Sequence, residues 1–114
     1  MSPLAELASR HCAPLKGAEH RLPETQCRQW LAALPGWELV ENGEAIAKTF
    51  RFEDYYRTMA FVNALAFVAH REDHHPDLAV GYAKVEVVLT THSVSGLSEN
   101  DFICAARIDA LGAA

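Results

Sequence analysis

The sequence lacks an apolar run near the ~20 residues that a membrane-spanning helix requires. Its first eleven residues lack a basic segment followed by an apolar one, so we expect neither a signal peptide nor a membrane partner. Excess positive charge is also absent, because ten Lys and Arg stand against fifteen Asp and Glu, for a formal net charge of −5. Negative charge repels phosphate backbones, so we do not expect direct nucleic-acid binding through bulk electrostatics.

Cysteine is scarce, and the chain has neither internal repeats nor low-complexity tracts. The three cysteines, Cys12, Cys27 and Cys104, are odd in number and widely spaced, unlike zinc-binding patterns. We therefore predict free thiols and a cytoplasmic protein. The 114 residues suffice for one domain, and 50% hydrophobic with 22% charged residues is typical of folded proteins and excludes intrinsic disorder.

Prolines and a glycine divide the N-terminal part from the rest. The sequence predicts a loosely structured arm over residues 1–21, with a short helix at 4–11. The residues that indicate it are Pro3, Pro14, Gly17 and Pro23. No second linker follows, so residues 22–114 are predicted to form a single domain.

Hydrophobic periodicity predicts the elements of this domain. Apolar residues at i, i+3, i+4 and i+7 predict a helix from Glu24 that Pro35-Gly36 ends. The Asn42-Gly43 pair predicts a hairpin between strands 37–40 and 45–52.

The second half repeats the order helix, strand, strand, helix. An apolar stripe predicts a long helix that begins at Glu53-Asp54 and ends near Asp73, before Pro76. Alternation then predicts strands 78–82 and 84–92, and residues 98–101 predict the capped start of a last helix to about Leu111.

The resulting order, α-β-β-α-β-β-α, defines an α+β fold. Hairpin connections imply a four-stranded antiparallel sheet with helices packed on one face. The other face is then wetted, used for binding or paired with another subunit.

Histidine is concentrated in one part of the chain. His70 and His74 lie four residues apart at a helix end, His75 follows directly, and His92 lies at the end of a predicted strand. Imidazole titrates near pH ~6.5, so these side chains suit a reaction that delivers one proton and removes another, such as loss of water. The structural alternative is that a histidine near a helix C-terminus, such as His70 or His74, serves only as a favourable partner of the helix dipole.

Other readings of these residues remain open from the sequence. His70 and His74 have the spacing of two zinc ligands, but Arg71 stands where a zinc protease has its glutamate. Asp101 at the third position of a helix can serve as a cap. Trp37 can be a core residue or an aromatic wall for a flat heterocycle.

A longer motif resembles a known family. The motif consists of His70, His74-His75-Pro76, Tyr82, His92 and Asp101. In this spacing, it resembles the signature of the pterin-4a-carbinolamine dehydratases. The likeness covers about residues 22–111. It includes the segments around Trp37, Asn42-Gly43, Phe50-Arg51-Phe52 and 96–101, which also resemble that family. Many members have glutamate where this chain has His70.

The resemblance implies a metal-free and cofactor-free enzyme. Members dehydrate 4a-hydroxytetrahydropterin to quinonoid dihydropterin, in the recycling of tetrahydropterin after aromatic amino-acid hydroxylation. By position, His74, His75 and His92 would be the catalytic imidazoles, with His75 the acid toward the C4a hydroxyl. His70, Asp101, Trp37 and Pro76 would support the site and the pterin.

The resemblance also implies partners and alternatives. A homodimer or homotetramer and a functional link to phenylalanine hydroxylase are expected. Animal members also stabilise dimers of a homeodomain transcription factor, so a non-catalytic protein-binding module is one alternative. A pterin-handling protein for molybdenum-cofactor enzymes is another.

Overall fold

The computed structural model describes residues 3–112, and within them the predicted element order is confirmed. Helix α2 (Glu24–Leu31) precedes the hairpin of β1 (Glu38–Val40) and β2 (Ala45–Arg51). Helix α3 (Tyr55–Glu72) leads to the hairpin of β3 (Asp77–Val80) and β4 (Lys84–Leu89), and α4 (Glu99–Gly112) follows. Among the described residues, no helix is long and apolar enough to cross a bilayer.

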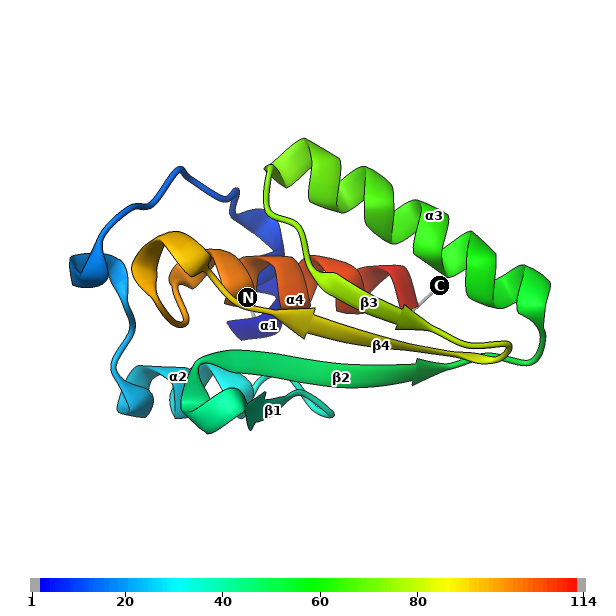
Figure 1. Ribbon diagram of the computed structural model, residues 1–114, viewed down its shortest axis with the longest axis horizontal. Helices are drawn as coiled ribbons and strands as arrows, with labels where there is room; N and C mark the ends of the chain where they lie inside the picture. The colour runs from blue at the N-terminus through cyan, green and yellow to red at the C-terminus, as the bar shows by residue number, and fades with distance from the viewer. Residues whose placement is uncertain (1–2, 113–114) are drawn as a thin grey trace.

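The sheet is four-stranded and antiparallel, in the order β1-β2-β4-β3. Its inner face is formed by apolar side chains such as Ile46, Val85 and Val87, all 0% exposed. Thr49 and Glu86 pair in register on the opposite face and are both exposed. This alternation confirms that the helices cover one face and leave the other to solvent (Figure 1).

The core lies between the inner face of the sheet and the helices. Helix α4 runs behind the sheet and α3 runs alongside it (Figure 1). Phe102 and Ile103 of α4 are fully buried there, as is Leu65 of α3. Lys48 breaks the apolar pattern of β2 but still points inward, because its ammonium pairs with Asp109 of α4 at 2.9 Å.

The N-terminal part is more ordered than we expected. Helix α1 (Pro3–Ser9) confirms the short helix, but it packs on α4 rather than belonging to a loose arm. Leu7 is 2% exposed and lies in the main hydrophobic cluster. The proline pattern indicated breaks in the chain correctly, but it carried no information on whether the segments between the breaks would dock. The boundary at residue 22 stays a prediction.

Two local expectations also differ in detail. The connection at residues 41–44 joins the two strands as expected, but it contains a 3₁₀ turn, η2 (Glu41–Gly43), with three successive positive φ angles. The strand expected to reach His92 ends at Leu89, and His92 begins the 3₁₀ turn η3 (His92–Val94). Thr91 pairs with Gly96 in an isolated bridge that closes this loop, so the chain turns away before His92.

Candidate active site

The C-terminus of α3 fixes the direction in which His74 leaves the helix. Asp73 adopts the left-handed conformation, with φ 51°. Its N–H donates to the carbonyl of His70, and the N–H of His74 donates to that of Ala69. This is the Schellman arrangement of a helix end, with Asp73 in the position that glycine usually takes. The backbone at His74 is therefore held in place before its side chain makes any contact.

Asp101 is a fully buried carboxylate at the start of α4. Its Oδ2 accepts hydrogen bonds from Thr91 Oγ1 at 2.7 Å and from the Ser98 N–H at 3.0 Å. Its Oδ1 lies 2.6 Å from His74 Nε2. The residue is 0% exposed, so these contacts replace the water that a carboxylate otherwise needs. Asp101 therefore caps α4, as one interpretation predicted, and also contacts a histidine from α3.

In the contact between Asp101 and His74, one residue is the hydrogen-bond donor and the other the acceptor. Asp101 accepts two hydrogen bonds through Oδ2, as a carboxylate does, so we assign the bridging proton to His74 Nε2. No group among the described residues hydrogen bonds His74 Nδ1. The arrangement can hold an imidazole in one tautomer, with the other nitrogen free for proton transfer.

His92 lies beside this pair because the residue before it in the chain contacts Asp101. It follows Thr91, whose hydroxyl contacts both Asp101 and Ser98. Its side chain is exposed and borders a cavity of about 260 Å³ lined by Glu41, Glu44, Thr90, Ser95 and Gly96. The structure therefore brings His74, Asp101 and the turn carrying His92 to one end of the molecule.

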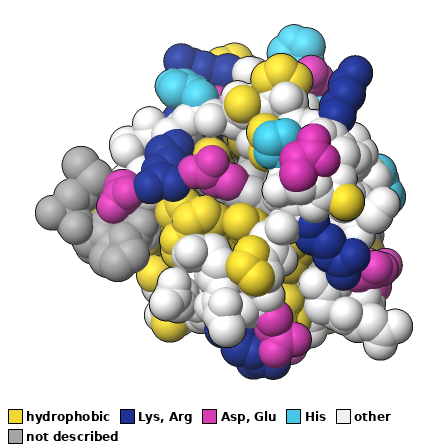
Figure 2. All heavy atoms as spheres, turned by 90° about the vertical axis from the view of Figure 1, so that its left-hand side faces the viewer, with side chains coloured by type: hydrophobic (Ala, Val, Ile, Leu, Met, Phe, Trp, Pro, Cys, Tyr) yellow, Lys and Arg dark blue, Asp and Glu magenta, His cyan; other side chains and the backbone are white. Residues whose placement is uncertain are grey.

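Three more of the predicted residues occupy the same end. His75 is exposed and Pro76 half-buried, directly after His74, and His70 is exposed on the last turn of α3. None of these three makes a side-chain hydrogen bond within residues 3–112. Viewed from this end, histidine side chains gather over the upper half of the surface, next to carboxylates and cationic side chains (Figure 2).

Trp37 lies apart from the histidines. It is 4% exposed, contacts the ring of Phe50 edge-on, and donates its indole N–H to Asp109 Oδ1 at 3.1 Å. Asp109 is eight residues along α4 from Asp101, a rise of about 12 Å. These are the contacts of a core residue, the other interpretation of Trp37, and its role against a pterin stays a prediction.

The donor set for a metal ion is incomplete. Over residues 3–112, no three His, Cys, Asp or Glu side chains are grouped so that they could hold an ion. His74 Nε2 is engaged by Asp101, and His70 is exposed at the helix surface. The zinc alternative therefore lacks a third ligand near its two histidines.

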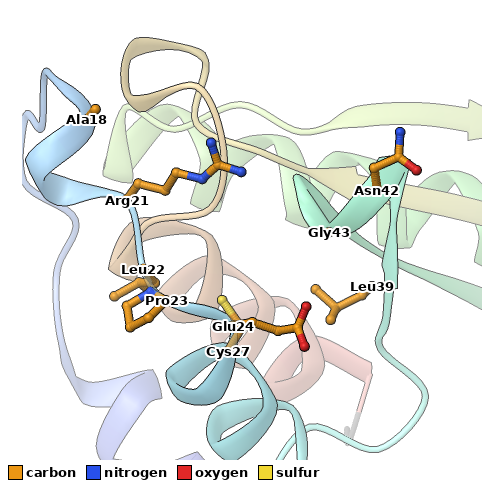
Figure 3. A pocket seen from close by; sticks show the side chains of 9 residues that line it. All are labelled: Ala18, Arg21, Leu22, Pro23, Glu24, Cys27, Leu39, Asn42 and Gly43. Carbon is orange, nitrogen blue, oxygen red and sulfur yellow. The ribbon is translucent and has the colours of Figure 1, made fainter.

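The sequence did not indicate a second cavity, of about 370 Å³, between the segment before α2 and the β1–β2 connection. The guanidinium of Arg21 and the carboxylate of Glu24 enter it from one side, opposite Leu39 and Asn42 (Figure 3). Arg21 also pairs at 3.8 Å with Glu44, which lines the His92 cavity, so the two cavities are neighbours. No motif links these residues, because they meet only through the fold.

Fold and site together define a class. The molecule is a small α+β domain in which a buried carboxylate orients an imidazole among further histidines, an arrangement suited to general acid and base chemistry. Residues 20–111 match the family model described as pterin 4 alpha carbinolamine dehydratase. The chain belongs to this family, which confirms the resemblance.

Relatives agree with this assignment over nearly the whole chain. A Stenotrophomonas maltophilia protein is 59% identical over 97% of this chain and 96% of its own length. One from Xanthomonas campestris pv. campestris is 61% identical over 94% and 91%. Both are provisionally named pterin-4-alpha-carbinolamine dehydratases.

Two solved structures share the fold. One, titled a transcriptional coactivator/pterin dehydratase from Brucella melitensis, is 37% identical with a TM-score of 0.77, covering 80% of this chain and 97% of that one. The other is titled a pterin dehydratase-like protein that is a RuBisCO assembly factor in the alpha-carboxysome. It is 30% identical with a TM-score of 0.59, covering 67% and 88%.

Proposed function

We propose that this chain is a hydro-lyase that converts 4a-hydroxytetrahydropterin to quinonoid dihydropterin and water. The observation that carries the proposal is the contact of 2.6 Å between His74 Nε2 and the buried Asp101. Exposed His75 directly follows His74 in the chain, and the turn that carries His92 lies close to the pair. Family membership supplies the substrate class.

The reaction needs one proton delivered and one removed. His75 acts as the acid and protonates the C4a hydroxyl as the C–O bond breaks, so the group leaves as water. A second imidazole, His74 or His92, accepts the N5 proton, and the N5 electron pair forms the C4a=N5 double bond. Asp101 is a positioning residue for His74, and His70, Pro76 and Trp37 support the pterin and the site.

The exposure of the histidines supports these roles. His75 and His92 are exposed, so a substrate can reach both rings without an opening motion. General acid and base catalysis contributes ~10²–10⁴-fold, which suffices for a carbinolamine that already loses water in solution. No metal or organic cofactor is needed for this chemistry, and the proposal assigns none.

The proposed place of this reaction follows from its substrate. 4a-Hydroxytetrahydropterin is released by aromatic amino-acid hydroxylases, so the proposal gives the chain a functional link to phenylalanine hydroxylase in the cytoplasm. The dehydrated product is the form that a reductase returns to tetrahydropterin.

We also propose a homodimer or homotetramer. Several large apolar side chains are exposed in the single chain, and burial of such groups favours association. They are Tyr55, Tyr56, Phe67, Val80 and Tyr82. A sizing column tests this proposal, and a strictly monomeric species would contradict it.

The decisive experiment measures the decay of 4a-hydroxytetrahydropterin with the wild type, His75→Ala and His20→Ala. We expect the wild type to accelerate the decay by ~10²–10⁴-fold and His75→Ala to lose most of that effect. His20 is an exposed histidine of η1 (Ala18–His20) without a proposed role, so its variant should retain the wild-type rate. If the wild type leaves the uncatalysed rate unchanged, the enzyme proposal is wrong.

The same assay with a chelator tests whether the activity requires a metal ion. Activity that falls with the chelator and returns with zinc would contradict the metal-free proposal and favour the zinc interpretation.

A second candidate function rests on the two solved structures, which are described as a coactivator and as an assembly factor. If the assay finds no dehydratase activity, the exposed aromatic side chains would instead form the surface of a protein-binding module. Pterin binding without turnover would instead favour a pterin-handling role, as with molybdenum-cofactor enzymes.

A further inference from the structure

Two cysteines far apart in the sequence face each other where the N-terminal segment packs on α4. Cys12 Sγ lies 3.5 Å from Cys104 Sγ of α4, although 92 positions separate the two residues. Both are free thiols, Cys104 is 1% exposed, and Cys12 is half-buried. Neither residue has a role in the proposed dehydration.

The backbone around Cys12 is held by side chains of α3 and α4. The Cys12 N–H donates to Glu72 Oε1 at 2.7 Å. Asn100 accepts from the Ala13 N–H at 3.1 Å and donates to its carbonyl at 2.7 Å, and Arg107 Nε donates to the Arg10 carbonyl at 2.9 Å. Contacts on both sides of Cys12 therefore keep its thiol opposite that of Cys104.

The geometry is close to that of a covalent link. A disulfide has its sulfurs about 2.05 Å apart, so the two atoms need to approach by about 1.5 Å. Rotation of two side chains and a small shift of the N-terminal segment can supply this movement, because Cys12 lies outside the regular helices and strands. No rearrangement of the sheet is involved.

The two thiols differ in solvent access. The hydrogen bond with Cys12, together with burial, raises the pKa of the Cys104 thiol, which therefore stays protonated. Cys12 is the one that solvent reaches. An oxidant therefore meets Cys12 first, and Cys104 is positioned to react with the product.

We propose that Cys12 and Cys104 form an oxidative modification site, in which a hydroperoxide converts the thiol pair into a disulfide that ties the N-terminal segment to α4. The Cys12 sulfur attacks the peroxide and the thiol gives up its proton; the O–O bond breaks, and the departing oxygen takes up that proton, giving a sulfenic acid and an alcohol, or water where the oxidant is hydrogen peroxide. The Cys104 sulfur then attacks the Cys12 sulfur, the S–O bond breaks, and the departing hydroxide leaves with the Cys104 proton as water. Two electrons pass from the thiol pair to the peroxide.

The link would act on a segment that reaches the candidate active site. Beyond Cys12, the carbonyl of Leu15 accepts from Ser93 Oγ at 2.6 Å, and the N–H of Gly17 donates to the Ser93 carbonyl at 2.9 Å. Ser93 follows His92 in the turn η3. The disulfide therefore fastens one end of a segment whose other end holds this turn, whether or not the chain is a dehydratase.

The test treats the full chain with hydrogen peroxide and then counts free thiols after denaturation. We expect the count to fall from three to one, with the mass of two hydrogen atoms lost, and a peptide map that joins Cys12 to Cys104. The Tm should rise by about 10 °C, because the link closes a long loop, and dithiothreitol should reverse both changes.

Variants separate this pair from the third cysteine. Cys12→Ser should abolish the link and the rise in Tm, and Cys27→Ala, which changes a buried cysteine outside the pair, should retain both. Substitution of buried Cys104 can impair folding, so Cys12→Ser decides the result. Retention of all three thiols, a link that includes Cys27, or further oxidation of Cys12 without a link would overturn the proposal.

Discussion

Glu72 is a buried carboxylate that joins three parts of the chain. Its side chain is 2% exposed and contacts His11 at 3.0 Å, the Cys12 N–H at 2.7 Å and Arg107 at 3.8 Å. Burial raises the pKa of this carboxyl, but the hydrogen bonds from Cys12 and His11 and the charge of Arg107 outweigh it, so the pKa lies below the ordinary 4.5. The folded state therefore favours the ionised form.

Glu72→Gln should make the stability less dependent on pH. A lowered folded-state pKa stabilises the protein above the ordinary carboxyl pKa, and this contribution is lost as the pH falls through the folded value. We expect the variant to lose about 1–3 kcal/mol at neutral pH, with the difference closing below about pH 4. Urea unfolding across this range measures it.

Glu53→Gln is the matched control for this prediction, because the Glu53 side chain is 81% exposed. Its effect should stay within about 0.5 kcal/mol at every pH. A deficit of Glu72→Gln that persists unchanged into acid would show that the charge of Glu72 does not stabilise the fold.

At the scale of elements, α3 depends on a single capping side chain. Asp54 Oδ1 accepts a hydrogen bond from the Arg57 N–H at 2.8 Å and so satisfies one of the free donors of the first turn. The helix has 18 residues and is about 27 Å long, so this cap is remote from His74 at the other end.

Asp54→Ala should therefore lower the free energy of unfolding by about 1 kcal/mol and leave the proposed dehydratase activity unchanged. Asp54→Asn retains a cap and should stay near wild-type stability. Thermal unfolding and the pterin decay assay measure the two quantities. A loss of activity matching the loss of stability would contradict the separation of cap and site.

At the scale of the whole molecule, the N-terminal helix is part of the core. Leu7 of α1 is 2% exposed and lies in the same cluster as residues of α4. We expect Leu7→Ala to cost about 2–5 kcal/mol of stability, because it leaves a cavity at a closed site.

Ser9→Ala, at an exposed position of the same helix, is its control and should change stability by less than about 0.5 kcal/mol. Chemical denaturation measures both variants. Equal stability of Leu7→Ala and the wild type would mean that α1 does not dock on α4 in solution.

The sequence by itself determined most elements of this protein, because they depend on signals within a few residues. Periodicity placed α3 and β4, Ser98 and Asp101 marked the start of α4, and His74-His75-Pro76 indicated the family. Errors occurred where a local pattern continued past a turn. Alternation carried the last strand to His92, whereas the bridge from Thr91 to Gly96 turns the chain before it.

Only the tertiary structure decided which distant groups meet. Asp101 could be a helix cap from its position alone, but its contact with His74 depends on how α3 packs against α4. The docking of Leu7, the burial of Trp37 and the thiol pair of Cys12 and Cys104 have the same origin. Local propensity acts over one or two turns of chain, whereas contacts across more than 90 positions, such as the 92 between Cys12 and Cys104, arise only when the core is packed.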